Sequence, residues 1–172
     1  RGQQNDDEGV EKALESGLRA HPASTVLGPK LKERLEARGD FRKLAEIHVF
    51  EADNAPDTAH RIAALRKAAS ILRDKEQDLR GAIDVLRRAL EIDASDRGVV
   101  AEFVGAQAEL GEHQVAAATI VSIASGIDAT HGVELMLHAA RVLIGVEGGG
   151  DAAVELVEEV RRRQPEAWDP VI

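Results

Sequence analysis

The pattern of apolar positions along the chain predicts amphipathic helices. It is clearest in residues 78–94, where one stripe of apolar side chains comprises Ala82, Ile83, Leu86, Ala89 and Leu90. Their spacing places these side chains on one face of an α-helix. A polar turn at residues 93–96 ends the stripe. We therefore expect a helix here that buries one face and exposes the other.

The same pattern returns along the chain. Equivalent apolar positions stand 34, 38, 34 and 37 residues apart, at Val10, Leu44, Ala82, Ala116 and Ala153. Five occurrences at this spacing predict a repeated structural unit. A second amphipathic helix precedes every one of these helices except the first, and we expect those preceding helices at residues 25–38, 57–75, 97–110 and 131–146. Each unit is then a pair of helices joined by short turns.

The turns between paired helices carry a family resemblance. Gly39-Asp40-Phe41 and Gly111-Glu112-His113 stand between the two helices of a pair, and prolines at positions 22, 56 and 165 end repeats. This arrangement resembles the tetratricopeptide repeat, although small or aliphatic residues replace that family's Trp, Leu-Gly and Tyr. The resemblance implies an all-α, right-handed α-solenoid of antiparallel helix pairs, with about nine helices. It extends to the long degenerate arrays of large bacterial proteins.

The repeat boundaries predict the domain organisation. We expect a disordered tail at 1–7, one repeat domain at 8–166, and a tail or cap at 167–172 that includes Trp168 as a packing residue. Within the domain, a lone second helix at 8–22 precedes repeats at 23–56, 57–96, 97–130 and 131–166.

The first helix, 8–20, is expected to turn Val10, Leu14 and Leu18 inward. No partner helix precedes it and the chain begins with Arg. We therefore expect a fragment of a longer protein, with possible self-association through exposed faces of the terminal helices.

Composition narrows the possible partners. The net charge is −9, which disfavours nucleic acid because its binding depends on neutralising phosphates. Residues 61–90 are the exception, with eight basic and four acidic side chains. There is no cysteine, no apolar stretch long enough to cross a membrane, and no signal peptide in the first residues. We expect neither nucleic acid nor membrane as a partner, and a cytoplasmic location.

No motif indicates catalysis, a cofactor or a metal. The six histidines are scattered, and no two lie closer than seven residues. The glycines at 148–150 precede a helix but bring no cation to hold a phosphate, and Asp151 is better explained as the N-cap of that helix. We therefore expect a protein that is not an enzyme.

Binding is the better prospect, because the resemblance implies a concave face lined by the first helix of each pair. Carrying the outward positions of the family onto this sequence gives candidate partner-binding residues at Arg66, Lys67, Ser70, Arg73, Ala101, Gly105, Ala108 and Arg141. The first four are basic or polar and could grip a carboxylate or phosphate. They could equally be ordinary solvating charges paired with Asp74 or Asp78. The small residues at 101–108 would suit an amphipathic peptide.

Two functions follow from these observations. The leading hypothesis is a scaffold that binds a peptide or a partner helix on its concave face. The alternative is a structural spacer within a longer array, with no ligand of its own. The lack of exposed aromatic anchors favours the spacer.

Overall fold

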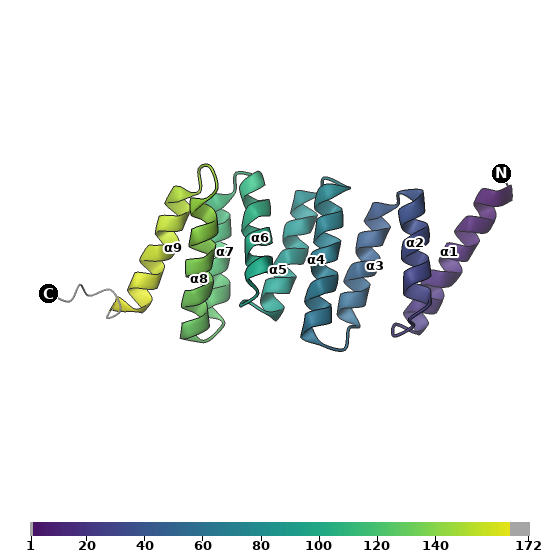
Figure 1. Cartoon of the computed structure of the whole chain (residues 1–172), viewed down its shortest axis with the longest axis horizontal. Coiled ribbons are helices and arrows are strands. Elements are labelled where there is room, and N and C mark those ends of the chain that lie inside the picture. The colour runs from purple at the N-terminus through teal and green to yellow at the C-terminus, as the bar shows by residue number, and fades with distance from the viewer. Residues whose placement is uncertain (1, 166–172) are drawn as a thin grey trace. The chain divides into compact units, whose positions relative to one another are not determined.

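A computed structural model describes residues 2–165, with side chains described from residue 9 onward. These residues form nine α-helices and no strand (Figure 1). Except at the starts of the first and last helices, the helices and the turns between them lie close to the predicted positions, and the expected all-α architecture is confirmed. Trp168 and the expected tail at 167–172 lie outside the described residues.

The chain divides into two compact units between Asp78 and Leu79. Unit 1 contains α1 (Gly2–Ala20), α2 (Leu27–Arg38), α3 (Phe41–Asp53) and α4 (Thr58–Asp74). Unit 2 contains α5 (Leu79–Ile92), α6 (Arg97–Glu109), α7 (His113–Ser125), α8 (Ala129–Ile144) and α9 (Gly150–Arg163). The boundary falls within the predicted repeat 57–96, next to the turn that follows α4. The single repeat domain expected from the sequence stays a prediction.

Within each unit, helices pack against their near neighbours in the chain. In unit 1, α2 packs between α1 and α3, and α3 packs against α4. In unit 2, each helix packs against the next, and α6 also contacts α8 while α7 contacts α9. Contacts between alternate helices are what stacked antiparallel pairs produce. Unit 2 is therefore a helical repeat stack of the kind that the tetratricopeptide resemblance implies, and unit 1 is a succession of helices each packed on the next.

Aspartate caps and left-handed glycines set the helix ends. Asp57, Asp96 and Asp128 each accept a hydrogen bond from a backbone N–H in the first turn of the helix that follows. Gly39 and Gly111 adopt φ angles of 73° and 71° between paired helices. Side chains other than glycine rarely adopt this conformation, so glycine allows the chain to reverse within one or two residues.

The predicted inward residues form the cores. In unit 1 the side chains of Leu31, Leu35, Leu65 and Ala68 are at most 2% exposed. In unit 2, Phe103, Met136, Leu143 and Leu156 are fully buried. Small residues at the helix contacts, such as Ala89 and Ala139, are buried as well and let neighbouring helices approach closely.

The first helix differs from its prediction in two ways. It begins at Gly2, so residues 2–7 are helical and are not the expected disordered tail. The prediction relied on an apolar stripe, which these polar residues do not carry. Val10 was expected to be buried but is 44% exposed, whereas Glu11 is 5% exposed. The buried stripe of α1 therefore includes Glu11 and Leu18, which are seven residues apart on one face.

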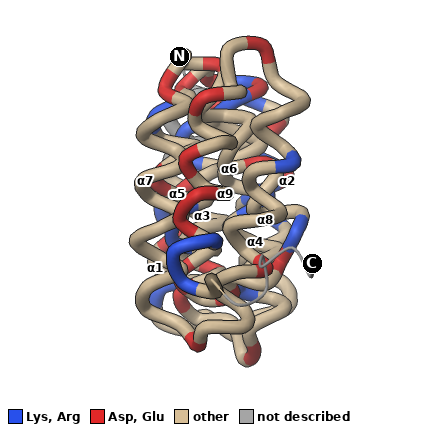
Figure 2. The backbone as a smooth tube through the Cα atoms, turned by 90° about the vertical axis from the view of Figure 1, so that its left-hand side faces the viewer, with Lys and Arg blue, Asp and Glu red and all other residues tan. Residues whose placement is uncertain are grey.

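The start of α9 also requires a correction. Asp151 was expected to be the N-cap, but the N-cap is Gly149, two residues earlier, and the helix begins at Gly150. Asp151 lies in the first turn, where its charge stabilises the helix dipole, and Arg161–Arg163 in the last turn do the same at the other end. Figure 2 shows this basic run in blue at the end of α9.

No helix in the described part of the chain is long and apolar enough to span a membrane.

Candidate partner-binding surfaces

The basic face of α4 comprises Arg66, Lys67, Ser70 and Arg73. Spacings of three, four and seven residues place Arg66, Ser70 and Arg73 on the same side of the helix. Lys67, Ser70 and Arg73 are exposed, and Arg66 is half-buried. Every member of this face is therefore at least partly accessible within unit 1.

Asp74 takes hydrogen bonds from two members of that face. Ser70 Oγ donates to Asp74 Oδ2 at 3.0 Å, and Arg73 Nε donates to Asp74 Oδ1 at 2.9 Å. The hydrogen bond from Arg73, followed by that from Ser70, lowers the pKa of the Asp74 carboxyl below its ordinary value. Asp78, the other carboxylate considered from the sequence, accepts a hydrogen bond from Arg42 at 3.3 Å.

The second group of predicted residues lies in unit 2. Ala101, Gly105 and Ala108 are half-buried positions on one side of α6. A β-carbon added at Gly105 would meet no atom within 4 Å, so this side of α6 is open. Arg141 is exposed on α8, which packs against α6. The eight predicted residues therefore form two candidate surfaces, one in each unit.

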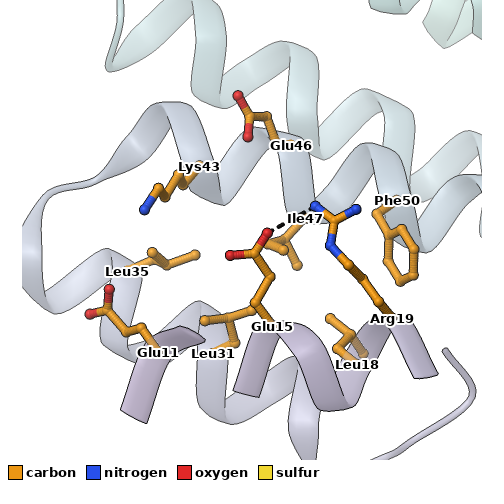
Figure 3. Close-up of a pocket in the computed structure, with 10 residues that line it drawn as sticks. All are labelled: Glu11, Glu15, Leu18, Arg19, Leu31, Leu35, Lys43, Glu46, Ile47 and Phe50. Atoms are coloured by element: carbon orange, nitrogen blue, oxygen red, sulfur yellow. Dashed lines mark hydrogen bonds and ion pairs between the residues drawn. The ribbon is translucent and has the colours of Figure 1, made fainter. Parts of the chain in front are cut away.

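A further surface in unit 1 was not predicted from the sequence. A cleft opens between α1, α2 and α3, and Figure 3 shows the side chains that line it. It encloses about 60 Å³. We call it the Glu11 cleft, and its lining comprises Glu11, Glu15, Leu18, Arg19, Leu31, Leu35, Lys43, Glu46, Ile47 and Phe50.

Glu11 is the unusual member of this cleft. Its side chain is 7% exposed, and Arg38 Nη1 donates to its Oε2 at 2.6 Å. Its other oxygen, Oε1, is buried and accepts no hydrogen bond from the described residues. Leaving a buried acceptor without a donor costs about 1–3 kcal/mol, and more when the group is charged. The fold therefore tolerates a destabilising arrangement at this position.

The other charged groups of the cleft are more exposed. Arg19 Nη2 donates to Glu15 Oε1 at 2.8 Å, one turn of α1 beyond Glu11, as Figure 3 shows. Lys43 Nζ lies 3.8 Å from the Asp40 carboxylate, and Glu46 is exposed on α3. The two cations of the lining therefore lie beside carboxylates other than Glu11.

The sequence did contain a signal for this site. Glu11 stands three residues before Leu14 and seven before Leu18, which places a carboxylate on the face that packs against α2. The prediction placed the neighbouring apolar residue, Val10, on the buried face of the helix instead of Glu11. A charged residue at a buried repeat position is the pattern that would have identified the cleft.

Histidines and carboxylates do not gather into a metal-binding group of three or more anywhere among the described residues. His60 and His131 each contact the aspartate that caps their own helix, Asp57 and Asp128. His48 lies 3.1 Å from Glu51 on α3. Each of these contacts joins residues three positions apart at a helix start or on a helix surface, so they are local capping contacts and surface pairs.

Comparisons with known proteins give similar structures at low sequence identity. No family model matches the sequence, and no curated protein matches it. The crystal structure of MamA is 19% identical, with 96% of this chain and 92% of that chain covered and a TM-score of 0.44.

Two further solved structures have the same TM-score of 0.44. The putative kinesin light chain TPR-like repeats of Podosopora anserina are 17% identical over 97% of this chain and 91% of that chain. YrrB, described as a TPR protein with an unusual peptide-binding site, is 13% identical over 96% and 81%. These TM-scores are too low to assign a family or a function to this chain.

Proposed function

We propose that this chain is a protein-binding scaffold that holds an acidic peptide or partner helix on the basic face of α4. The observation that carries the proposal is the pair of hydrogen bonds to Asp74. The Ser70 hydroxyl and the Arg73 guanidinium converge on one carboxylate, at 3.0 and 2.9 Å. Asp74 therefore occupies the place that a partner's carboxylate would take.

The contact with Asp74 leaves this face open to competition. The Arg73 and Asp74 side chains are 41% and 47% exposed. Ion pairs between exposed side chains contribute only about 0–1 kcal/mol. A partner carboxylate that also contacts Lys67 can displace Asp74 at little cost. The open side of α6 offers unit 2 a separate apolar surface for the same class of partner.

The structural spacer remains the second candidate, and the same contact favours it. A face whose donors are already satisfied by its own carboxylate needs no partner. Arg66 also takes part in an interaction within the chain. In this second account the excess of basic side chains in residues 61–90 keeps the surface of α4 hydrated and holds its side chains in place.

A capture experiment from a lysate of the source cells distinguishes the two functions. The full chain is compared with a Lys67→Glu/Arg73→Glu variant, because both side chains are exposed and their reversal disturbs no core contact. The control is Arg87→Glu/Arg88→Glu on α5, which makes the same change in net charge at exposed positions outside both predicted surfaces. Circular dichroism checks that helicity is equal in all three proteins.

The scaffold account predicts a specific partner that the control retains and the α4 variant loses. It further predicts that Asp74→Asn, which removes the competing charge, retains more of that partner than the wild type does. Equal capture by all variants would place binding away from α4. No specific partner for any variant would favour the spacer.

A further inference from the structure

The Glu11 cleft presents an acceptor that lacks a donor. Oε1 of Glu11 is buried and accepts no hydrogen bond from the described residues, while Arg38 satisfies only Oε2. A carboxylate has about four lone-pair sites and accepts several hydrogen bonds at once. Oε2 of Glu11 therefore has a donor, and Oε1 has the capacity to accept one more hydrogen bond.

A cationic donor suits this position better than a neutral one. Hydrogen bonds between charged groups are roughly twice as strong as those between neutral groups. The cleft is lined by three carboxylates, those of Glu11, Glu15 and Glu46, and by two cations. Those cations are held near other carboxylates, Arg19 by Glu15 and Lys43 by Asp40. With Arg38 beside Glu11 and Asp40 beside Lys43 included, these groups comprise four carboxylates and three cations, so their net negative charge favours a positive group from outside the chain.

The floor of the cleft suits the stem of such a group. Leu31 and Leu35 from α2 and Ile47 and Phe50 from α3 supply apolar contacts beside the carboxylates, as Figure 3 shows. Lysine and arginine side chains lay their methylene stems along apolar surfaces and keep the charged end near a polar partner. A cavity of about 60 Å³ holds only a few waters, at about 10–15 Å³ each, which matches one long side chain and not a folded element.

We propose that the Glu11 cleft binds a lysine or arginine side chain of a partner peptide. The stem lies on Leu35 and Ile47, and the cation donates to Glu11 Oε1. This inference goes beyond the proposed function, because it adds another surface of unit 1 and a partner of the opposite charge. It does not depend on the basic face of α4.

The probe for this site is a phage-displayed library of random dodecapeptides. It is selected on the full chain carrying Lys67→Glu and Arg73→Glu, so that acidic peptides bound by α4 are not recovered. The selected peptides are then synthesised, and their Kd values are measured by fluorescence anisotropy. The proposal predicts a shared lysine or arginine beside an aliphatic residue.

The matched protein variants are Glu11→Gln and Glu33→Gln. Glu33 is exposed on α2 outside the cleft, so it controls for the loss of one negative charge. We expect Glu11→Gln to weaken binding by about tenfold or more, because a charge-assisted hydrogen bond is lost, and Glu33→Gln to change it by less than about twofold. Replacing the shared basic residue of the peptide with methionine should weaken binding to the wild-type chain equally. This comparison of two peptides uses only the wild-type chain, so it does not depend on whether a protein variant folds.

Three results would overturn the proposal. They are selected peptides without a common basic residue, equal Kd values for the Glu11→Gln and Glu33→Gln variants, and tight binding of the methionine peptide. A lysate partner that is lost by the α4 variant would leave the proposed function standing even if these peptide results removed the Glu11 site. The two proposals therefore fail separately.

Discussion

Gly132 of α8 lies directly against the carbonyl of Ala124 at the end of α7. A β-carbon added at Gly132 would stand 2.7 Å from that oxygen, closer than real side chains approach a backbone atom. The same oxygen accepts a hydrogen bond from Arg163 Nη1 of α9 at 3.3 Å. One carbonyl near the end of α7 therefore joins three helices of unit 2.

The approach of α8 to α7 should make Gly132→Ala destabilising. Alanine is the better helix former by about 1 kcal/mol, but a clash with backbone in a packed site costs about 1–3 kcal/mol. Gly105→Ala on α6 is the matched control, since its β-carbon meets no atom within 4 Å, and it should stabilise unit 2 by about 0.5–1 kcal/mol. Urea unfolding followed by circular dichroism measures both. Equal gains in stability at the two positions would show that the helices are not this close.

Arg163 should contribute more to stability than its neighbour Arg162. Arg163 donates to Glu159 at 2.8 Å and to Ser125 Oγ at 2.8 Å, in addition to its bond with Ala124. We expect Arg163→Ala to lower the free energy of unfolding of unit 2 by about 1–2 kcal/mol. The Arg162 side chain is 68% exposed and pairs only with Glu159 among the contacts described, so Arg162→Ala should cost no more than about 0.5 kcal/mol. Hydrogen exchange of the last amides of α7 gives an independent reading, which a purely local role for Arg163 would leave unchanged.

Glu11 should be dispensable for stability although it is buried. Glu11→Met removes the carboxylate oxygen that lacks a donor, and it takes one hydrogen-bond partner from Arg38, whose side chain is 49% exposed and can be hydrated. We expect the free energy of unfolding to stay the same or to rise by about 1 kcal/mol. A loss of more than about 1 kcal/mol in urea unfolding would mean that the Glu11–Arg38 pair holds α1 in place, and would assign Glu11 a structural role.

His131 should titrate above its ordinary range. The hydrogen bond with Asp128, and then the charge of that carboxylate, raise the pKa of His131 above 6.5. A raised pKa in the folded state means that this contact stabilises the protein fully below about pH 6.5 and ceases to do so as the pH rises through the folded-state value. NMR titration of the ring protons measures the shift. Asp128→Asn retains the N-cap but removes the charge, and it should return the pKa of His131 towards 6.5.

Helix positions followed from the sequence because each helix carries an apolar stripe and an end signal; the exception is the start of α1, residues 2–7, which carry no apolar stripe. Leu86 and Phe103 fall where the stripes place them, and Gly39 and Gly111 reverse the chain at the predicted turns. Gln77 shows the limit of that reasoning. It adopts a φ of 54° in the turn after α4, a conformation usually taken by glycine, and nothing in its identity predicts this.

The sites were less predictable, because they depend on contacts between helices. Exposure of Lys67 and Arg73 follows from helical periodicity alone. The sequence also offered Asp74 and Asp78 as carboxylates that could pair with this face, but the choice of Asp74 depends on side-chain rotamers. The burial of Glu11 could have been predicted from its position seven residues before Leu18, but the opening of the cleft depends on how far α1 stands from α3, which no local pattern records. The boundary between Asp78 and Leu79 likewise reflects the density of contacts on each side and not a change in composition.

Site-specific photo-crosslinking in the source cells tests the central claim most directly. The photoreactive residue p-benzoylphenylalanine is placed at position 67, on the basic face of α4, and at position 88, on the exposed side of α5, as the control. The scaffold account predicts a discrete cross-linked product at position 67 that is absent at position 88 and reduced by Arg73→Glu. The same pattern of products at both positions, or none at position 67, would contradict it.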